Sequence, residues 1–197
     1  KLSSYTAMTC DANGTLWFTQ DNKLFSLHPG KDLLPTFAIS VPRDITCLHF
    51  SDDQNLWIGT FGRGLYHYSK DGKIKRIALS NSADEHILSI THKGKELWVA
   101  SFNGIDVLDI AGTPVVTNHY NKRNGIGSDY IYHLHTDTAQ RIWMATDGGG
   151  IVRYDKGRFQ KWNDKNGLNS NVFYCVTTDN SGEAWGSSMD KGIYHFN

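Results

Sequence analysis

Histidine is the residue type that most readily suggests chemistry in this chain, which contains nine of them. His133 and His135 flank Leu134, so on a strand both imidazoles would share one face and could converge on a metal ion. A zinc site needs at least three protein ligands, and the sequence places no third ligand beside this pair. His67 and His195 recur at one position, before an aromatic strand end, which favours outward-facing strand residues. We therefore expect no bound metal.

Carboxylates that could act in acid–base catalysis are scarce. Glu occurs three times, and Glu96 and Glu183 fall in predicted turns. Asp137 and Asp179 also fall in turns, where an aspartate side chain caps the backbone. The glycine run 148–150 joins two predicted strands, whereas a phosphate-binding loop opens a helix. We therefore expect no catalytic residue and no cofactor.

The three cysteines are odd in number and have no metal-ligand spacing. Cys47 and Cys175 each lie ten residues before a Trp, so they occupy equivalent strand positions in repeats that are not neighbours. We expect small apolar strand residues here, without a disulfide between them.

The elements that position these residues follow from a repeated tryptophan phrase. Five times a Trp is followed by small residues, a turn and an aromatic or aliphatic strand end, at steps of 40, 41, 45 and 42 residues. A fixed period of this length indicates a repeat architecture. We expect each of these indoles to wedge between neighbouring repeats as a structural residue; the five are Trp17, Trp57, Trp98, Trp143 and Trp185.

One repeat reads as a set of short strands. In the fourth copy, 130–136 is rich in β-branched and aromatic residues, 137–140 is a turn, and 142–146 carries the Trp. A third strand follows a glycine turn, and a fourth alternates polar and apolar residues as 157–162 does. Four short antiparallel strands in about 40–45 residues describe one blade of a β-propeller.

The sequence therefore predicts an all-β fold, a β-propeller of four-stranded antiparallel blades with about five repeats. A β-solenoid is the competing architecture, although its repeats are usually shorter, and no 3.6-residue periodicity supports helical repeats. The chain contains five copies of the inner strands but only four of the outer strand. Two architectures are consistent with these numbers: a part of a larger wheel of about seven blades, or a ring of five units. We expect one propeller segment, 1–197, with units at 1–40, 41–81, 82–124, 125–166 and 167–197.

The repeat resembles that of two-component regulator propellers over essentially the whole chain. The segment 55–68, NLWIGTFGRGLYHY, is the closest single copy. The third copy departs from the pattern because it lacks the turn Asp, and the first has Gln20 and Asn22 where Gly is usual. In the last copy the matching residues are Asn171, Phe173, Val176, Asp179, Gly182 and Trp185.

This resemblance implies the periplasmic, extracytoplasmic sensor region of a hybrid two-component histidine kinase. Kinase activity and any contact with the membrane would then belong to parts of the parent protein absent here. Many such propellers resemble detectors of glycan fragments, which implies a non-catalytic sensory segment that binds an oligosaccharide. The remaining propeller blades or a second copy of the chain are the other expected partners. Lys1 leads directly into repeat sequence, so we expect a segment of a longer protein.

Ligand-binding candidates are expected in the loops of one propeller face. The loop into each first strand and the loop between the second and third strands lie on that face. There, an aromatic ring beside planar hydrogen-bonding groups would suit the apolar face and the hydroxyl rim of a sugar. The candidates are Phe61, Arg63, Phe102, Asn103, Arg123, Asp147, Asp190 and Lys191.

Bulk properties exclude some function classes and leave two alternatives. The formal net charge is zero, so the basic footprint of a nucleic-acid-binding protein is missing. No apolar run reaches the length of a membrane span. A protein-interaction or dimerisation scaffold is one alternative. A metal-dependent enzyme is the other, because the phrase at 14–22 is similar to the repeats of streptogramin B lyases.

Overall fold

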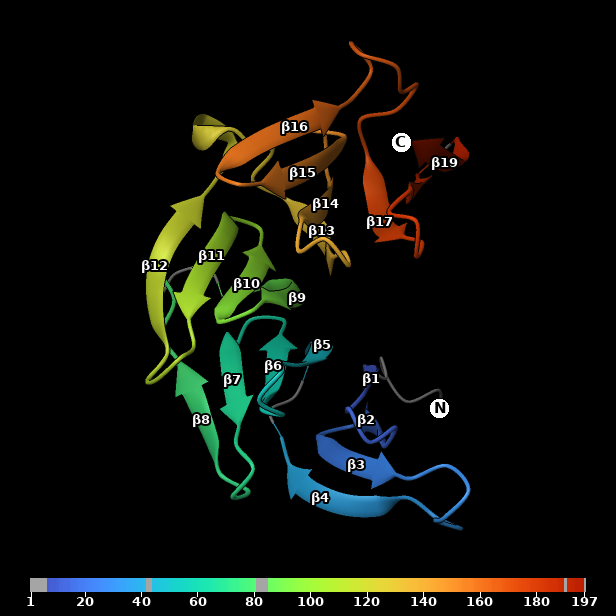
Figure 1. Ribbon diagram of the computed structural model, residues 1–197. Coiled ribbons are helices and arrows are strands. Elements are labelled where there is room, and N and C mark those ends of the chain that lie inside the picture. Colours follow the sequence, from blue (N-terminus) through green and yellow to red (C-terminus); the bar gives the residue numbers. More distant parts are fainter. Residues whose placement is uncertain (1–6, 42–43, 81–84, 190, 197) are drawn as a thin grey trace. The chain divides into compact units, whose positions relative to one another are not determined.

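The chain folds as a series of small antiparallel β-sheets (Figure 1). The computed structural model describes residues 7–41, 44–80, 85–189 and 191–196. It divides into two compact units, Lys1–Ile90 and Thr91–Asn197, which we describe separately.

Unit 1 contains two complete four-stranded sheets. Each is a simple meander, in which every strand pairs with the next along the chain. The first sheet comprises β1 (Met8–Cys10), β2 (Leu16–Gln20), β3 (Lys23–Leu27) and β4 (Thr36–Ser40). The second sheet comprises β5 (Ile45–Phe50), β6 (Leu56–Thr60), β7 (Leu65–Tyr68) and β8 (Ile74–Ile77).

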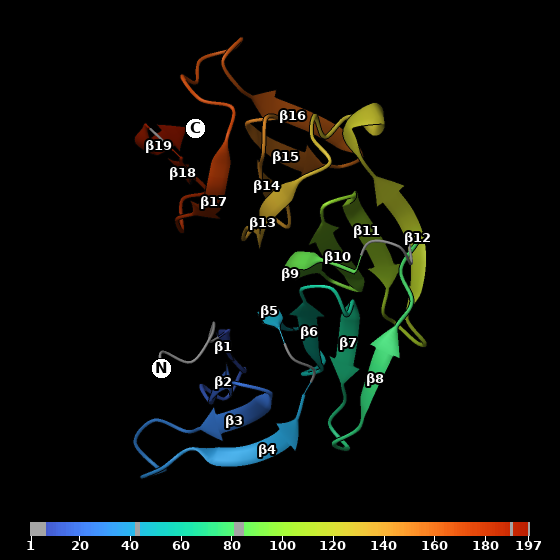
Figure 2. The ribbon, with the colours of Figure 1, turned by 180° about the vertical axis from the view of Figure 1, so that it is seen from behind.

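Unit 2 contains two further sheets and most of the third sheet, whose first strand crosses the unit boundary. The meander order is the same (Figure 2). The third sheet comprises β9 (Ile87–Lys93), β10 (Glu96–Ser101), β11 (Gly104–Asp109) and β12 (Val115–Tyr120). A short 3₁₀ helix, η1 (Lys122–Asn124), leads to the fourth sheet: β13 (Ile131–Thr136), β14 (Ile142–Thr146), β15 (Ile151–Asp155) and β16 (Arg158–Trp162). The fifth sheet comprises β17 (Phe173–Thr178), β18 (Ala184–Ser188) and β19 (Gly192–Phe196).

In the first, fourth and fifth sheets the turn before the Trp strand is capped by an aspartate side chain, as predicted for the turn aspartates. Asp137 accepts the backbone N–H groups of Ala139 and Arg141 through Oδ1, at 3.0 and 2.9 Å. Its Oδ2 accepts the indole N–H of Trp143 at 2.8 Å. Asp11 caps its turn in the same way. One carboxylate therefore holds both the turn and the ring of the following strand.

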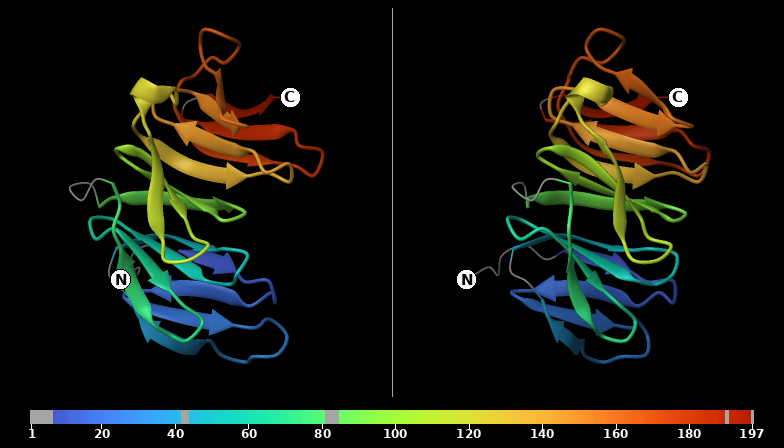
Figure 3. Two further views of the ribbon diagram at one scale, coloured as in Figure 1. Left: turned by 60° about the vertical axis from the view of Figure 1, so that its left-hand side comes forward. Right: turned by 90° about the vertical axis from the view of Figure 1, so that its left-hand side faces the viewer.

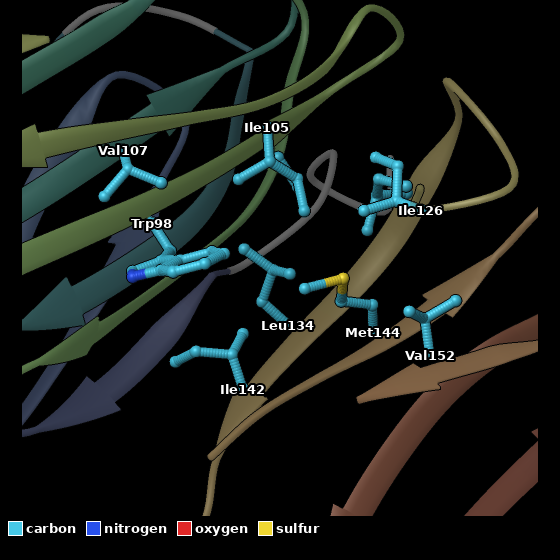
Figure 4. Packing of buried hydrophobic residues seen from close by; sticks show 10 residues of the cluster. Trp98, Ile105, Val107, Ile126, Leu134, Ile142, Met144 and Val152 are labelled. Carbon is cyan, nitrogen blue, oxygen red and sulfur yellow. The ribbon is translucent and has the colours of Figure 1, made fainter. Parts of the chain in front are cut away.

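The tryptophans of unit 2 pack between neighbouring sheets. Trp98 of the third sheet lies in one cluster with Leu134, Ile142 and Met144 of the fourth (Figure 4). Trp143 of the fourth sheet lies in the next cluster, with Phe173 of the fifth. Both indoles are buried, which confirms the predicted wedge at these two positions.

The prediction that each repeat Trp packs between neighbouring repeats is wrong for Trp185, in the last copy. Its side chain is 41% exposed, whereas that of Trp143 is 1% exposed. The reason is positional, because Trp185 lies on the side of the fifth sheet that faces away from the fourth. The phrase around Trp185 is the same, but its burial depends on a neighbouring sheet.

The sheets of unit 2 follow one another in chain order (Figure 3), and backbone hydrogen bonds also join them at one end. Gly148 and Gly150, after β14, both donate to the carbonyl of Asn171, which precedes β17. Gly104, the first residue of β11, donates to the carbonyl of Asp129, which precedes β13. In the third and fourth sheets, the loop after the Trp strand is therefore held against the segment that leads into the next sheet.

The cysteines occupy equivalent strand positions, as predicted. Cys47 is the partner of Gly59 in its sheet, and Cys175 is the partner of Ser187 in another. Both cysteines are free thiols. Burial raises the pKa of Cys47 to about 12, which fits an inert strand residue. Cys175 is exposed, and its Sγ lies 3.9 Å from Nδ1 of His133 in the fourth sheet.

Candidate functional site

The two candidates in unit 1 lie in the turn between β6 and β7. Phe61 is exposed, and its ring meets the His86 imidazole edge to face at 4.3 Å between centroids. Arg63 is also exposed, and its backbone carbonyl accepts a hydrogen bond from Arg76 Nε at 3.2 Å. Arg76 in turn pairs with Glu85. These contacts support the turn and leave the Arg63 side chain directed to solvent.

In unit 2, two of the predicted residues, Phe102 and Asp147, both contact Tyr130, in the segment that leads into β13. The ring of Phe102 packs against the ring of Tyr130, with 5.3 Å between centroids. The backbone N–H of Asp147 donates to the carbonyl of the same Tyr130 at 2.9 Å. Phe102 belongs to the turn before β11 and Asp147 to the turn after β14, so the segment that leads into β13 joins the two turns.

Two further tyrosines complete this region. The hydroxyl of Tyr132 donates to Asp147 Oδ2 at 3.1 Å, and the Tyr132 ring lies 5.0 Å from the ring of Tyr174. Tyr130 and Tyr174 are 49% and 45% exposed. We call this set the tyrosine–aspartate surface; it consists of Phe102, Tyr130, Tyr132, Asp147 and Tyr174.

The strand register explains why Tyr132 and Tyr174 point here. Pairing between β13 and β14 skips Tyr132, so this residue forms a β-bulge, and Tyr174 forms the same bulge in β17. A bulge turns a side chain away from the regular alternation of the strand. Our sequence reasoning missed both tyrosines. Each lies eleven residues before its Trp, so the shared aromatic at this position was the available signal.

Asp147 is held in place from several directions. Its carbonyl accepts a hydrogen bond from the hydroxyl of Ser128 at 2.5 Å, and its backbone forms an isolated β-bridge with Val172, which directly precedes β17. Burial and the neighbouring Asp147 raise the pKa of Tyr132, so the phenol stays protonated and donates to the carboxylate. The remaining carboxylate lone pairs face solvent beside exposed rings, since Asp147 is itself exposed.

The other candidates in unit 2 lie apart from these contacts. The backbone N–H of Asn103 donates to Ser101 Oγ at 3.0 Å, within its own turn. Arg123 lies exposed on η1, where its backbone N–H donates to Asn121 Oδ1 at 2.9 Å. Lys191 precedes β19 and donates its backbone N–H to Ser188 Oγ at 2.9 Å. Asp190 lies outside the described residues.

His133 and His135 lie on β13 and form polar contacts with residues of β17 in the next sheet. The Nδ1 atom of His133 accepts the backbone N–H of Val176 at 3.4 Å, and His135 Nε2 meets Thr178 Oγ1 at 2.9 Å. Burial lowers the pKa of both imidazoles. Across the described part of the chain, no three His, Cys, Asp or Glu side chains are arranged to hold a metal ion.

His195 is exposed, as expected for an outward-facing strand residue, whereas His67 is half-buried, which corrects the expectation for it. His67 stacks on Trp57 with 4.7 Å between centroids, and His195 stacks on Trp185 at 4.2 Å. Each histidine is the cross-strand partner of its Trp, so the imidazole covers part of the indole. His195 also pairs with Glu183 at 2.8 Å.

Comparisons with known proteins agree with this architecture. No family model matches the chain, and no curated protein sequence matches it. Among solved structures, the extracellular domain of a hybrid two-component system from B. thetaiotaomicron matches 97% of this chain at 21% identity, with a TM-score of 0.76. The chain covers 28% of that domain, which is less than a third of its length.

Two other structures give a similar match. Virginiamycin B lyase from Staphylococcus aureus aligns with 97% of the chain and 69% of its own length, at 18% identity and a TM-score of 0.74. The WD40 β-propeller domain of Doa1 aligns with 97% of the chain and 64% of its own, at 15% identity and a TM-score of 0.73. The predicted fold class is confirmed: the sheets are blades of a β-propeller. No helix in the described ranges could span a lipid bilayer.

Proposed function

We propose that this chain is a non-catalytic, ligand-binding segment of an extracytoplasmic sensor and that it binds an oligosaccharide at the tyrosine–aspartate surface. Two observations support the sensor role. The repeat resembles that of two-component regulator propellers, and the fold is that of an extracellular domain of such a system. On this proposal the segment is periplasmic, and the histidine kinase lies elsewhere in the receptor.

The choice of an oligosaccharide as the ligand rests on one observation. The exposed rings of Tyr130 and Tyr174 lie in the same surface as the Asp147 carboxylate, whose position is fixed by hydrogen bonds. Tyr130 and Tyr174 expose nearly half of their surface, although aromatic rings of this size are usually buried more fully. Asp147 lies between them in the chain and is oriented by the Tyr132 hydroxyl. Flat aromatic faces suit the apolar face of a pyranose, and a carboxylate accepts hydrogen bonds from sugar hydroxyls.

The test is a thermal-shift screen of the chain against a panel of oligosaccharides. A ligand that binds only the folded state raises the melting temperature. We expect one sugar class to do so and expect Tyr174→Ala and Asp147→Asn to abolish the shift. The matched control is Asp155→Asn, because Asp155 lies at the opposite end of the same sheet. Its shift should equal that of the unmodified chain.

Two results would overturn the proposal. One is a broad panel in which no oligosaccharide raises the melting temperature. The other is a shift that survives both Tyr174→Ala and Asp147→Asn, which would place the ligand elsewhere. Metal-dependent turnover of a cyclic peptide lactone would instead favour the lyase alternative, and a stable protein complex without any sugar response would favour the scaffold.

A further inference from the structure

Asp147 carries the charge of the tyrosine–aspartate surface, since the other members of this set are uncharged aromatic residues. Its side chain is exposed, and Oδ2 accepts a hydrogen bond from the Tyr132 hydroxyl at 3.1 Å. Among the residues that the structure describes, no ion pair includes Asp147. The carboxylate therefore has a donor that orients it but, within that part of the chain, no cation that neutralises it.

Two lysines next to this surface are directed elsewhere. The Lys122 ammonium pairs with Asp129 Oδ2 at 3.3 Å, in the segment that leads into β13. The Lys161 side chain lies over Gly127, where a Cβ atom would be 3.8 Å from Nζ. Neither lysine forms an ion pair with Asp147, so the negative charge is left available to a ligand.

The Tyr132 phenol shows the sign of the electrostatic field at this surface. Burial is the largest cause of its raised pKa, and the hydrogen bond to Asp147, the Asp147 charge and the phenols of Tyr174 and Tyr130 add to it. A second negative charge is therefore disfavoured beside the carboxylate. The same field favours a positive charge on a bound ligand.

The aromatic rings favour a cation for a second reason. The ring of Phe102 lies against Tyr130 and that of Tyr132 against Tyr174, with 5.3 and 5.0 Å between centroids. The face of an aromatic ring is electrostatically negative and attracts an ammonium group within about 6 Å of its centroid. The Tyr130 side chain is 49% exposed, so a ligand can reach it.

The carboxylate is also held in position by the backbone on both sides of it. The Asp147 N–H donates to the carbonyl of Tyr130, and its backbone forms a β-bridge with Val172. The next residue, Gly148, donates to the carbonyl of Asn171 at 3.0 Å. These contacts fix the turn between the segments that lead into β13 and β17. A group that is already ordered loses little conformational freedom when a ligand binds.

We propose that the tyrosine–aspartate surface selects oligosaccharides that contain amino sugars, with the protonated amine of the sugar bound at Asp147. This selectivity rests on the proposed function, because it requires that an oligosaccharide binds here. A protonated amine donates a charge-assisted hydrogen bond to the carboxylate, which is stronger than the hydrogen bond of a neutral hydroxyl. A sugar acid would instead bring a second carboxylate beside Asp147. The expected order of affinity is therefore amino sugar, neutral sugar, sugar acid.

The test is isothermal titration calorimetry of the chain with matched trisaccharides that differ in one substituent of each ring. The chitosan trimer has an amine at this position, cellotriose a hydroxyl and the chitin trimer an acetamide. At mildly acidic pH and low salt we expect the chitosan trimer to bind about tenfold more tightly than cellotriose or the chitin trimer. Added sodium chloride should weaken the binding of the chitosan trimer alone, because salt screens exposed charges.

Asp147→Asn separates the charge of the carboxylate from its shape. In this variant the chitosan trimer should bind no more tightly than cellotriose, and salt should have no effect on its affinity. Asp155→Asn is the matched control, because it removes the same charge at the opposite end of the same sheet. It should keep the tenfold preference of the unmodified chain. Circular dichroism confirms that both variants are folded.

Four results would overturn the proposed selectivity. Cellotriose that binds as tightly as the chitosan trimer would do so and would leave the oligosaccharide function standing, as would a galacturonic acid trimer that binds more tightly than either. A preference for the amine that survives Asp147→Asn would place the amine elsewhere. Trilysine that binds more tightly than the chitosan trimer would assign the surface to a basic peptide. If no trisaccharide binds, the proposed function fails together with the selectivity.

Discussion

The fourth and fifth sheets contain the same tryptophan phrase in two different environments. Trp143 and Trp185 occupy the same strand position, and each has a cross-strand partner on the third strand of its sheet. Trp143 is buried among residues of the following sheet, whereas Trp185 lies on a surface. The difference teaches that the phrase specifies a strand and a side chain direction, while a neighbouring sheet decides whether the indole becomes core.

The largest expected difference between the two sheets is the cost of removing the indole. Trp143→Ala should lower the free energy of unfolding by about 3–5 kcal/mol, because it leaves a void between two sheets. Trp185→Ala should cost less than about 1 kcal/mol, since solvent already reaches the ring. Urea denaturation of both variants at low protein concentration measures this. Equal losses would show that the two environments do not differ as described.

A second comparison uses two glycines at the start of the third strands, since Gly150 directly precedes β15 and Gly192 is the first residue of β19. Gly150 and Gly192 both have positive φ, +80° and +83°. A Cβ at Gly150 would lie 2.0 Å from the carbonyl oxygen of Trp162, whereas a Cβ at Gly192 would meet no atom within 4 Å.

Alanine at either position incurs the backbone strain of positive φ, about 1 kcal/mol. Gly150→Ala should cost about 2–4 kcal/mol in total, because the clash with backbone forces a shift of β16. Thermal unfolding of the two variants checks the ranking. If Gly192→Ala proved the more destabilising, the close approach at Gly150 would not constrain the fold.

The smallest of the three effects concerns acid stability. Burial alone would raise the pKa of Asp137, but hydrogen bonds from the Trp143 indole and from Arg141, with the Arg141 charge, hold it below its usual range. The unfolded carboxyl titrates near its ordinary value of about 3.9, so its contribution to stability is present above that pH. As the pH falls through the lower pKa of the folded state, this contribution is lost.

Asp137→Asn should therefore cost about 1–3 kcal/mol at neutral pH, as the loss of a charged hydrogen-bond acceptor does. It should also flatten the dependence of stability on pH in the acid range. Asp155→Asn is the control, because Asp155 is the last residue of β15 in the same sheet. The measurement is urea denaturation between about pH 7 and about pH 3. An unchanged acid dependence in Asp137→Asn would contradict the role of this carboxylate.

Much of the framework was predictable because it is repeated. The strand around Trp143, the turn at Asp137 and the equivalence of Cys47 with Cys175 follow from local patterns that recur in each copy. The loop residues Phe102 and Asp147 were also identified from the turns that carry them. The tyrosines beside them were not, because a β-bulge changes the direction of a side chain without a turn residue that marks it.

By itself, the sequence determined the strands, their order and the capped turns, since these depend on residues within about 40–45 positions of one another. Only the tertiary structure decided which face of each sheet is buried, because that depends on the side chains of another sheet. It also decided that Asp147 meets Tyr132 and that Phe102 meets Tyr130, contacts between neighbouring segments that no local pattern encodes. The exposure of the Trp185 ring has the same physical reason. An indole on the face of a sheet is buried only when a neighbouring sheet packs against that face, and a single repeat has no such second sheet.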